Sequence, residues 1–412
     1  MGSMKQLLFA LIFLFCVLLV MQAQPAGSSS LQTGNDSLIL VPKVDSVKQV
    51  DLVDYLVSWF KIKNSEERRD NRKIRFALFP TSSSSGKTSF TSFNASFILG
   101  GDASKTNVST IYFYPYIGFG GQYGFDVQSF LWYPQNKWNF IGEYFIHNYP
   151  QNTWGLGGNT PDDNESMVEN AHLRIHQKSM KEIWPHFSAG LGYALDYHYN
   201  IAVEQIWSDS LSEYLPYYQE KSVSSGVLLP LLYDSRLNSA NPKQGFMAAL
   251  TFRINTPYLG SDNKWQSMFL DVRKYFPVFR KWRENILALR GYYWTTLAGD
   301  VPYLDLPSIR WEPSTGQASR GIQQNRYKSN AMIDLEAEYR FSITENGFFG
   351  GVIFGSMTSV SEYDSQHFLY WHPAGGAGVR MKFNKYSNTN ISFDVAVSKG
   401  FLNVYLFIGE AF

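Results

Sequence analysis

Two histidines, His172 and His176, have the spacing that brings two imidazole ligands together on one face of a helix, so a metal site is the first chemistry to consider. Polar and apolar side chains alternate around this pair, however: Asn170, His172, Arg174 and His176 against Ala171, Leu173 and Ile175. This alternation favours a strand, on which both histidines point to the same side as Arg174. We therefore expect no metal site at this pair.

Two other short patterns are similar to catalytic motifs. The segment 86–88, Gly-Lys-Thr, is similar to the end of a phosphate-binding loop, but Thr81 stands where the opening glycine is needed. Ser84 and Lys87 have Ser-x-x-Lys spacing, which a run of four serines produces by chance. The sequence contains no nucleophile-elbow pattern and no dinucleotide-binding fingerprint. We therefore expect neither catalysis nor a cofactor, and interpret this segment as an outer loop.

The composition restricts the class of protein. The 412 residues include 36 Lys+Arg against 35 Asp+Glu, so no basic excess supports a nucleic-acid partner. Aromatic and charged residues each make up 17%, against a charged share of about 25% in typical soluble domains. The only long apolar run is 7–21, which excludes a polytopic helical membrane protein. An aromatic-rich chain with a mean hydropathy of −0.22 is typical of a transmembrane β-barrel, in which lipid-facing and lumen-facing residues alternate.

The N-terminus has the layout of a secretory signal peptide. Lys5 precedes the apolar run, which ends at Met21-Gln22-Ala23. We expect a signal peptide at 1–23, with a retained membrane anchor as the alternative. The single cysteine, Cys16, lies inside this segment, so the mature chain has no thiol for a disulfide, a metal or a nucleophile.

Residues 24–72 are predicted to form a periplasmic leader that ends in a helix. The segment 24–41 is rich in Ser, Gly, Gln and Pro, with little to bury. Apolar residues then recur at helical spacing, which predicts an amphipathic helix of about three turns: Val50, Val53, Leu56, Val57 and Phe60. The helix has a basic flank. It could lie on the inner membrane surface, occupy a pore or pack against the protein's own rim.

From 73 to 412 the chain alternates in short segments separated by Gly, Pro, Asn and Asp, and a membrane-crossing strand needs about 9–11 residues. We predict sixteen strands, beginning near Lys73, Ser89, Val108, Tyr123, Lys137, Met167, Trp184, Ser222, Gly245, Lys264, Asn285, Ser329, Phe348, Gly375, Thr389 and Leu402. Short inner turns and long outer loops, as at 298–328, are typical of outer-membrane barrels. The predicted fold is therefore all-β: a 16-stranded transmembrane antiparallel β-barrel in the bacterial outer membrane, with a short N-terminal periplasmic helix.

The segment 332–341 illustrates the two faces. Its period of two places four charged residues, Asp334, Glu336, Glu338 and Arg340, on one face and apolar residues on the other. Backbone groups in hydrocarbon must be paired internally, so such strands require a sheet that closes on itself. At the end of the chain, Phe412 is predicted to share the apolar face of Val404, Leu406 and Ile408. This ending resembles the C-terminal signal by which barrels are recognised for membrane assembly.

Two internal blocks resemble one family. The segment 233–238, Tyr-Asp-Ser-Arg-Leu-Asn, contains Asp234 and Arg236 and precedes Pro242 and Gly245. It resembles the Y-D-x-R-x-N…P-x-x-G pattern at an inner turn of barrels of the Omp85 superfamily, also called the bacterial surface antigen family.

Before the twelfth predicted strand, Arg320, Gly321 and Ile322 are similar to the R-G-(F/Y) tip of that family's sixth loop, which folds into the barrel. The ending, with 375–380, Asp394 and 409–412, is similar to the family's last strands.

The chemistry of this loop tip can be predicted. An arginine presents five donors and keeps its charge, so an inward-folded Arg320 needs carboxylates. The candidates are Asp334, Glu336 and Glu338. The family's own partner is an aspartate in an F-x-D-x-G pattern, but here the sequence at 354–356 is Phe-Gly-Ser. Either one of the three carboxylates replaces that aspartate or the loop is held less firmly; an exposed Arg320 is the alternative.

The resemblance implies a role in the assembly or translocation of outer-membrane proteins. Outer-membrane lipid would surround the barrel, and other outer-membrane or periplasmic proteins would be partners in a larger complex. Family members that insert proteins carry periplasmic POTRA modules, and the segment between Ala23 and the first predicted strand is too short for one. We therefore expect a member without them. The alternatives are a passive or plugged channel and a structural scaffold for surface lipoproteins.

Overall fold

The computed structural model describes residues 49–59, 75–82, 88–97, 99, 106–107, 109–118, 121–203, 220–236, 238, 241–278, 284–310, 318–385 and 388–412. Three of the sequence-based predictions lie outside these residues. They are the signal peptide at 1–23, the leader up to residue 48, and the serine-rich loop that contains Ser84 and Lys87.

The first strands and one helix have these bounds: α2 (Leu52–Trp59), β1 (Arg75–Ser82), β2 (Thr88–Phe97), β3 (Ser109–Gly118), β4 (Tyr123–Trp132), β5 (Trp138–Asn148), β6 (Gln151–Thr153), β7 (Ser166–Trp184), β8 (Phe187–Val203) and β9 (Lys221–Asp234). The remaining strands are β10 (Gly245–Asn255), β11 (Trp265–Pro277), β12 (Asn285–Gly299), β13 (Ala331–Ser342), β14 (Phe349–Val360), β15 (His372–Asn384), β16 (Thr389–Ser398) and β17 (Phe401–Ile408). Short 3₁₀ turns are η3 (Pro134–Asn136), η4 (Asp162–Asn164), η6 (Pro257–Leu259) and η7 (Tyr303–Asp305).

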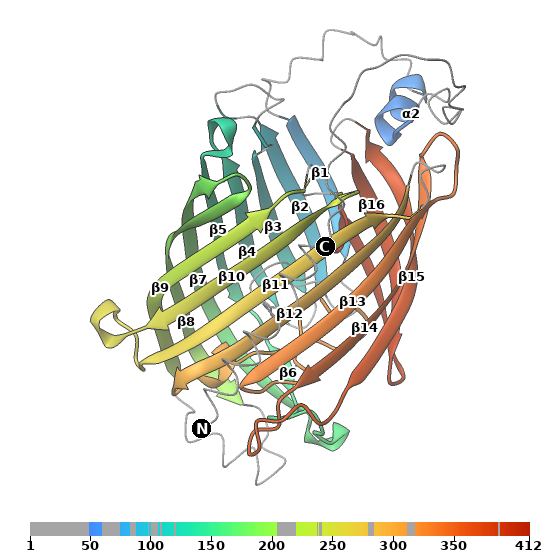
Figure 1. Ribbon diagram of the computed structural model, residues 1–412. Coiled ribbons are helices and arrows are strands. Elements are labelled where there is room, and N and C mark those ends of the chain that lie inside the picture. The colour runs from blue at the N-terminus through green and yellow to red at the C-terminus, as the bar shows by residue number, and fades with distance from the viewer. Residues whose placement is uncertain are drawn as a thin grey trace. The chain divides into compact units, whose positions relative to one another are not determined.

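These strands form one antiparallel sheet, in which they lie obliquely side by side (Figure 1). Long strands pair with their neighbours in the sequence, and the short β6 pairs with the start of β7. β1 pairs along its length with β2 and also meets β17, where Ser82 is opposite Leu406. We call the end of the sheet at which β1 begins the inner end, and the opposite end the outer end.

Strand boundaries follow the turn-forming residues. The predicted starts at Tyr123, Gly245, Asn285 and Thr389 coincide with the starts of β4, β10, β12 and β16. The start predicted at Trp184 is displaced, because Trp184 ends β7 and β8 begins at Phe187. A tight turn separates these two strands, with His186 at a φ of +67°. β7 has 19 residues and β8 has 17, which is longer than the about 9–11 that a membrane crossing requires.

The sheet buries its polar face. On β13 the side chains of Asp334, Glu336, Glu338 and Arg340 are buried, whereas Leu335 is 43% exposed. Large apolar side chains on other strands, such as Ile353 and Val379, are also exposed. A sheet in a soluble protein buries its apolar face, so this distribution of polar and apolar side chains is the inverse of that in a soluble protein. The four charged residues of β13 therefore lie in the interior.

The predicted amphipathic helix is α2, and it packs against turns at the inner end. Asp51 accepts a hydrogen bond from the Lys385 backbone at 2.9 Å, and Asp54 pairs with the Lys385 ammonium at 2.6 Å. The ring of Tyr55 lies 4.6 Å from that of Phe348. Of the three predicted positions for this helix, the structure has the one against the protein's own rim. Among the described residues, no helix is long and apolar enough to cross a membrane.

Candidate functional site

The connection from β12 to β13, here called the 300–330 loop, folds back from the outer end into the interior. Its described residues contact β8 and β9 near one end and β13, β14, β16 and β17 near the other. Apolar side chains of the loop pack with strand residues in one buried cluster: Ile309, Ala318, Ile322 and Tyr327 with Phe269, Tyr292, Met332 and Val360. The loop is therefore part of the interior packing.

Arg320 lies at the inner tip of this loop and is only 2% exposed. Its guanidinium donates to Asp394 on β16 through Nη1 and to Glu338 on β13 through Nη2. The ring of Phe354 on β14 lies 3.7 Å from the guanidinium carbon, which adds a cation–π contact. Three strands thus hold one side chain of the loop.

Two further arginines share these carboxylates. Arg340 Nε donates to Glu338 at 2.6 Å, and Arg380 Nη1 donates to Asp394 at 2.5 Å. Arg380 Nε also donates to Glu410 at 2.7 Å. We call this group the Arg320 cluster: Arg320, Glu338, Arg340, Arg380, Asp394 and Glu410. Its three positive and three negative charges balance, as buried ions require.

The neighbours of Arg320 in the loop are equally constrained. Gly321 has a φ of +104°, and a Cβ there would lie 3.0 Å from the Val397 carbonyl oxygen. Its N–H donates to the Tyr405 hydroxyl at 2.9 Å. The aromatic position of the family's tip is here occupied by Ile322, which is buried in the apolar cluster of the loop. The positive φ and the close approach of the Val397 carbonyl both explain why this residue is a glycine.

The three predicted carboxylates bind different groups of the loop. Glu338 binds Arg320, whereas Glu336 accepts from the Ser319 backbone at 2.6 Å and Asp334 accepts from the Ser319 hydroxyl at 2.8 Å. Asp334 and Glu336 therefore hold the residue before Arg320, and the second partner of the guanidinium is Asp394. The sequence prediction did not include Asp394 as a partner.

Two glycines of the ending show why Asp394 and Phe354 can reach the arginine. A Cβ at Gly378 would lie 1.9 Å from Asp394 Oδ1, and one at Gly376 would lie 2.6 Å from the Phe354 ring. Only residues without a side chain leave this room. Alternation along β16, together with the paired glycines of 375–378, was the available signal for this site.

The inner-turn motif forms a local ion pair. Arg236 donates to Asp234 through Nε at 2.9 Å and through Nη2 at 2.8 Å, a bidentate geometry. Gly245 has a φ of +112°, which favours glycine at that position, and Pro242 is buried. This turn lies beyond the inner end of β9. It shapes the rim instead of the loop attachment.

The position predicted for Phe412 is wrong. The chain leaves β17 after Ile408, because Gly409 has a φ of +96° and ends the alternation. Phe412 is consequently 3% exposed and lies below Arg340, whose guanidinium carbon is 5.7 Å from the ring. It packs with the interior residues Tyr405 and Phe407 and not with the outward face of the strand.

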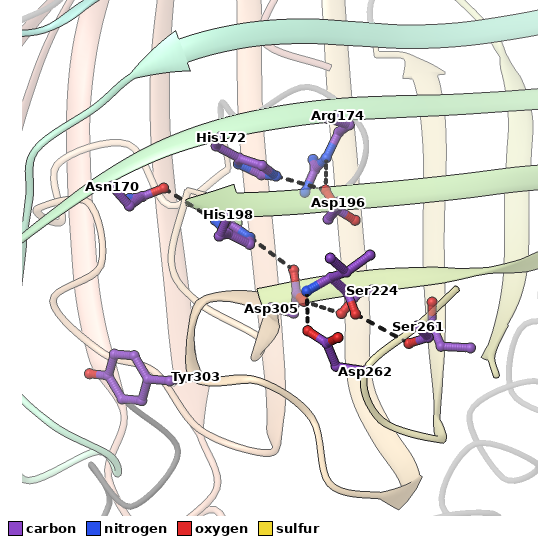
Figure 2. A network of polar contacts seen from close by, with 12 residues as sticks. Asn170, His172, Arg174, Asp196, His198, Ser224, Ser261, Asp262, Tyr303 and Asp305 are labelled. Atoms are coloured by element: carbon purple, nitrogen blue, oxygen red, sulfur yellow. Dashed lines mark hydrogen bonds and ion pairs between the residues drawn. The ribbon is translucent and has the colours of Figure 1, made fainter. Parts of the chain in front are cut away.

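A second polar group surrounds Asp196 on β8, which is fully buried (Figure 2). His172 and His176 both face this carboxylate, at 2.9 Å and 2.8 Å. Arg174 and Arg253 also pair with it. We call these five residues the Asp196 network. Within the described part of the chain, no group of His, Cys, Asp and Glu has the geometry to hold a metal.

The 300–330 loop reaches this region through Asp305. His198 Nε2 lies 3.2 Å from Asp305 Oδ1, and Ser224 donates to Asp305 Oδ2 at 2.6 Å (Figure 2). Serine and histidine each bind the carboxylate and do not bind each other, so the histidine is not placed to activate the hydroxyl. These residues serve to attach the loop to the wall formed by β8 and β9.

The outer part of the loop also binds other connections. Arg326 pairs with Asp162 and donates to the Thr160 carbonyl at 2.8 Å. Hydrogen bonding to Arg326 lowers the pKa of Asp162. Burial lowers the pKa of the Lys328 ammonium from 10.5 to about 8, against the opposing charge of Asp305. The outer part of the loop therefore contains two groups, Asp162 and Lys328, whose pKa values are shifted by their surroundings.

Comparison with solved structures gives three similar folds. The crystal structure of BamA from Haemophilus ducreyi lacking POTRA domains 1–3 matches with a TM-score of 0.51 and 13% identity, over 83% of this chain and 70% of that one. CdiB from Acinetobacter baumannii matches with a TM-score of 0.53 and 11% identity, over 82% and 60%. CdiB from Escherichia coli matches with a TM-score of 0.52 and 11% identity, over 81% and 62%.

This chain has the fold of these barrels. At such low identity the likeness concerns the fold alone, and the chain spans less than two thirds of each CdiB chain. No protein-family model matches the sequence. No curated protein matches it either. The shared fold agrees with the resemblance drawn from the loop tip and the inner turn.

Proposed function

We propose that the protein is a bacterial outer-membrane barrel in which sixteen strands close a cylinder. β6, with three residues, is too short to cross a bilayer, and the other sixteen strands pair in a circuit that returns from β17 to β1. A closed cylinder would pair the backbone groups of neighbouring strands, as hydrocarbon surroundings demand, and the junction of β1 and β17 contributes one such pair among the described residues.

The exposed residues support a lipid environment. Apolar side chains such as Leu191, Ile353 and Leu402 point outward along the strands. At the inner end, Trp138 and Trp184 are 42% and 65% exposed. Aromatic residues at the boundary between lipid and water are typical of membrane barrels. The outward face therefore suits lipid, while the ion pairs lie inside.

The function that we propose is the assembly or translocation of other outer-membrane proteins, as one subunit of a larger complex and without catalysis or a cofactor. The observation that carries it is the Arg320 cluster, which holds an inward-folded loop inside a barrel of the BamA and CdiB fold.

Depletion tests this role directly. Cells that lose the protein should show lower outer-membrane levels of unrelated barrels, and the wild-type gene should restore them. An Arg320→Ala variant should restore them less well, whereas Lys264→Ala, which removes an exposed charge, should act like wild type. Unchanged barrel levels after depletion would count against assembly.

We further propose that the junction of β1 and β17 opens during this activity. Among the described residues, this junction has a single pair, Ser82 with Leu406, whereas β1 and β2 share eight. Cysteines placed at Ser82 and Leu406 should form a disulfide that blocks function until it is reduced. Full activity of the oxidised double variant would exclude opening at this pair.

A plugged channel is the second candidate, because the 300–330 loop fills part of the interior. Removal of residues 300–330 should then produce a large, steady conductance in planar bilayers. If both the native chain and the deletion variant stay closed, the channel function is ruled out.

A further inference from the structure

A cavity of about 60 Å³ lies beside the Asp196 network, between β7, β10 and the 300–330 loop. This volume exceeds the about 10–15 Å³ that one water requires. Its lining combines basic and aromatic residues, among them Arg174, Arg253 and Trp265. Such a lining offers several donors to one small molecule.

Lys178 also lines the cavity, and its ammonium has no hydrogen-bond or ion-pair partner within the described residues. Its cross-strand neighbours are Ile141 on β5 and Gly192 on β8, which provide no side-chain acceptor. The nearest carboxylate on β5, Glu143, accepts from Arg174 at 3.1 Å. An ammonium in the interior without an acceptor is costly, so this position favours a negatively charged ligand.

The charged groups around the cavity also favour an anion. Arg174, Lys178 and Arg253 line it, and Asp305 is the one lining residue among the described ones with a carboxylate. Asp305 is already bound by His198 and Ser224. Asp196 lies behind the arginines, fully buried and saturated by four partners. An anion in the cavity would therefore meet mainly positive groups.

We propose that this cavity binds a small inorganic anion, such as phosphate or chloride, with Lys178 as its principal ligand and Arg174 and Arg253 beside it.

Four histidines also line the cavity: His147, His172, His176 and His198. The His172 and His198 rings are stacked, with centroids 3.7 Å apart. The positive charge beside the ligand comes from Arg174, Lys178 and Arg253.

The test uses the full chain in detergent, with a bulky organic acid as the background anion at constant ionic strength. Inorganic phosphate, and chloride in a parallel series, should raise the unfolding temperature to a plateau. Calorimetry should give one saturable site. Heat without saturation, or no heat, would overturn the proposal.

Lys178→Met should weaken phosphate binding on the order of tenfold, since one charge-assisted hydrogen bond is lost. The matched control is Lys181→Met on the same strand, whose ammonium lies outside the cavity over the Trp138 ring and is exposed. It should bind like wild type. If Lys178→Met does not fold, Lys178→Gln takes its place. Equal binding by the Lys178 and Lys181 variants would refute the assignment.

Discussion

The 300–330 loop is attached to the barrel wall at two places with different chemistry. At the inner attachment, the guanidinium of Arg320, which keeps its charge over the whole accessible pH range, pairs with Glu338 and Asp394. At the outer attachment, Asp305 binds an imidazole and a hydroxyl, and the Lys328 ammonium is buried nearby. The same loop therefore has one attachment that is insensitive to pH and one that is not.

This difference suggests how such a loop can be both fixed and adjustable. Buried guanidinium–carboxylate pairs stabilise little on balance, but they are costly to break on one side. The inner attachment thus defines where the loop lies. The Lys328 ammonium, with a pKa of about 8, can gain or lose its charge without leaving its place, so the outer attachment can change strength while the tip stays in position.

The largest expected effect comes from Arg320→Ala. The change leaves two buried carboxylates with fewer partners, removes the contact with Phe354 and should lower the free energy of unfolding by about 3–5 kcal/mol. Thermal unfolding in detergent measures the loss. Arg320→Lys should fall between wild type and alanine, because an ammonium keeps the charge but lacks the planar, five-donor geometry of the guanidinium. Lys264→Ala serves as a control. If Arg320→Ala unfolded at the same temperature as Lys264→Ala, the tip of the loop would not be docked.

A smaller, pH-dependent effect is expected at Lys328. Burial holds the folded-state pKa near 8, below the ordinary 10.5, so the unfolded chain binds more protons between these values. Stability should therefore rise with pH through this window, by on the order of 3 kcal/mol for the full shift. Below pH 8 the buried ammonium is unfavourable, and Lys328→Met should be more stable than wild type.

The comparison of unfolding temperatures at pH 7.5 and pH 10 checks this sign. The difference between Lys328→Met and wild type should shrink at the higher pH, whereas that between Arg320→Ala and wild type should stay constant. Equal pH slopes for wild type and Lys328→Met would contradict a lowered pKa and would remove the distinction between the two attachments.

The strand pattern was accessible from the sequence because one face of each strand is polar. Alternation on β13 predicted that Glu338 points inward, and the arginine at the loop tip predicted that it needs a carboxylate. The sequence could not show which strands meet across the interior. Asp394 is 74 residues from Arg320, and only the curvature of the sheet brings them together. The second carboxylate partner of Arg320 therefore lies on a strand that local spacing could not identify.

The predicted position of Phe412 was wrong for a related reason. The period of two holds only while the backbone remains extended, and Gly409 ends it. The Asp196 network was also missed as a group, although His172, Arg174 and His176 were placed on one face. Their shared carboxylate lies on the following strand, and the lateral pairing of β7 with β8 decides that Asp196 is opposite Arg174.

The smallest expected effect lies at the outer pair of Asp162 and Arg326. The side chain of Asp162 is 76% exposed and that of Arg326 only 8%, so the pair itself should contribute at most about 1 kcal/mol. Asp162→Ala should barely change the unfolding temperature. Because Arg326 lowers the pKa of Asp162, the small contribution is present above the ordinary carboxyl pKa and is lost as the pH falls below it.

Arg326→Ala provides the matched comparison. It also removes the hydrogen bonds to Thr160 and the stacking on Trp154 and Tyr327, whose rings lie 5.2 Å and 4.6 Å from the guanidinium carbon. The arginine variant should therefore lose clearly more stability than the aspartate variant. Equal losses would mean that the exposed ion pair, and not the packing of the guanidinium, holds this part of the loop. The strength of the outer attachment would then depend on the salt concentration. The two attachments would differ in how deeply their ion pairs are buried, and not only in how they respond to pH.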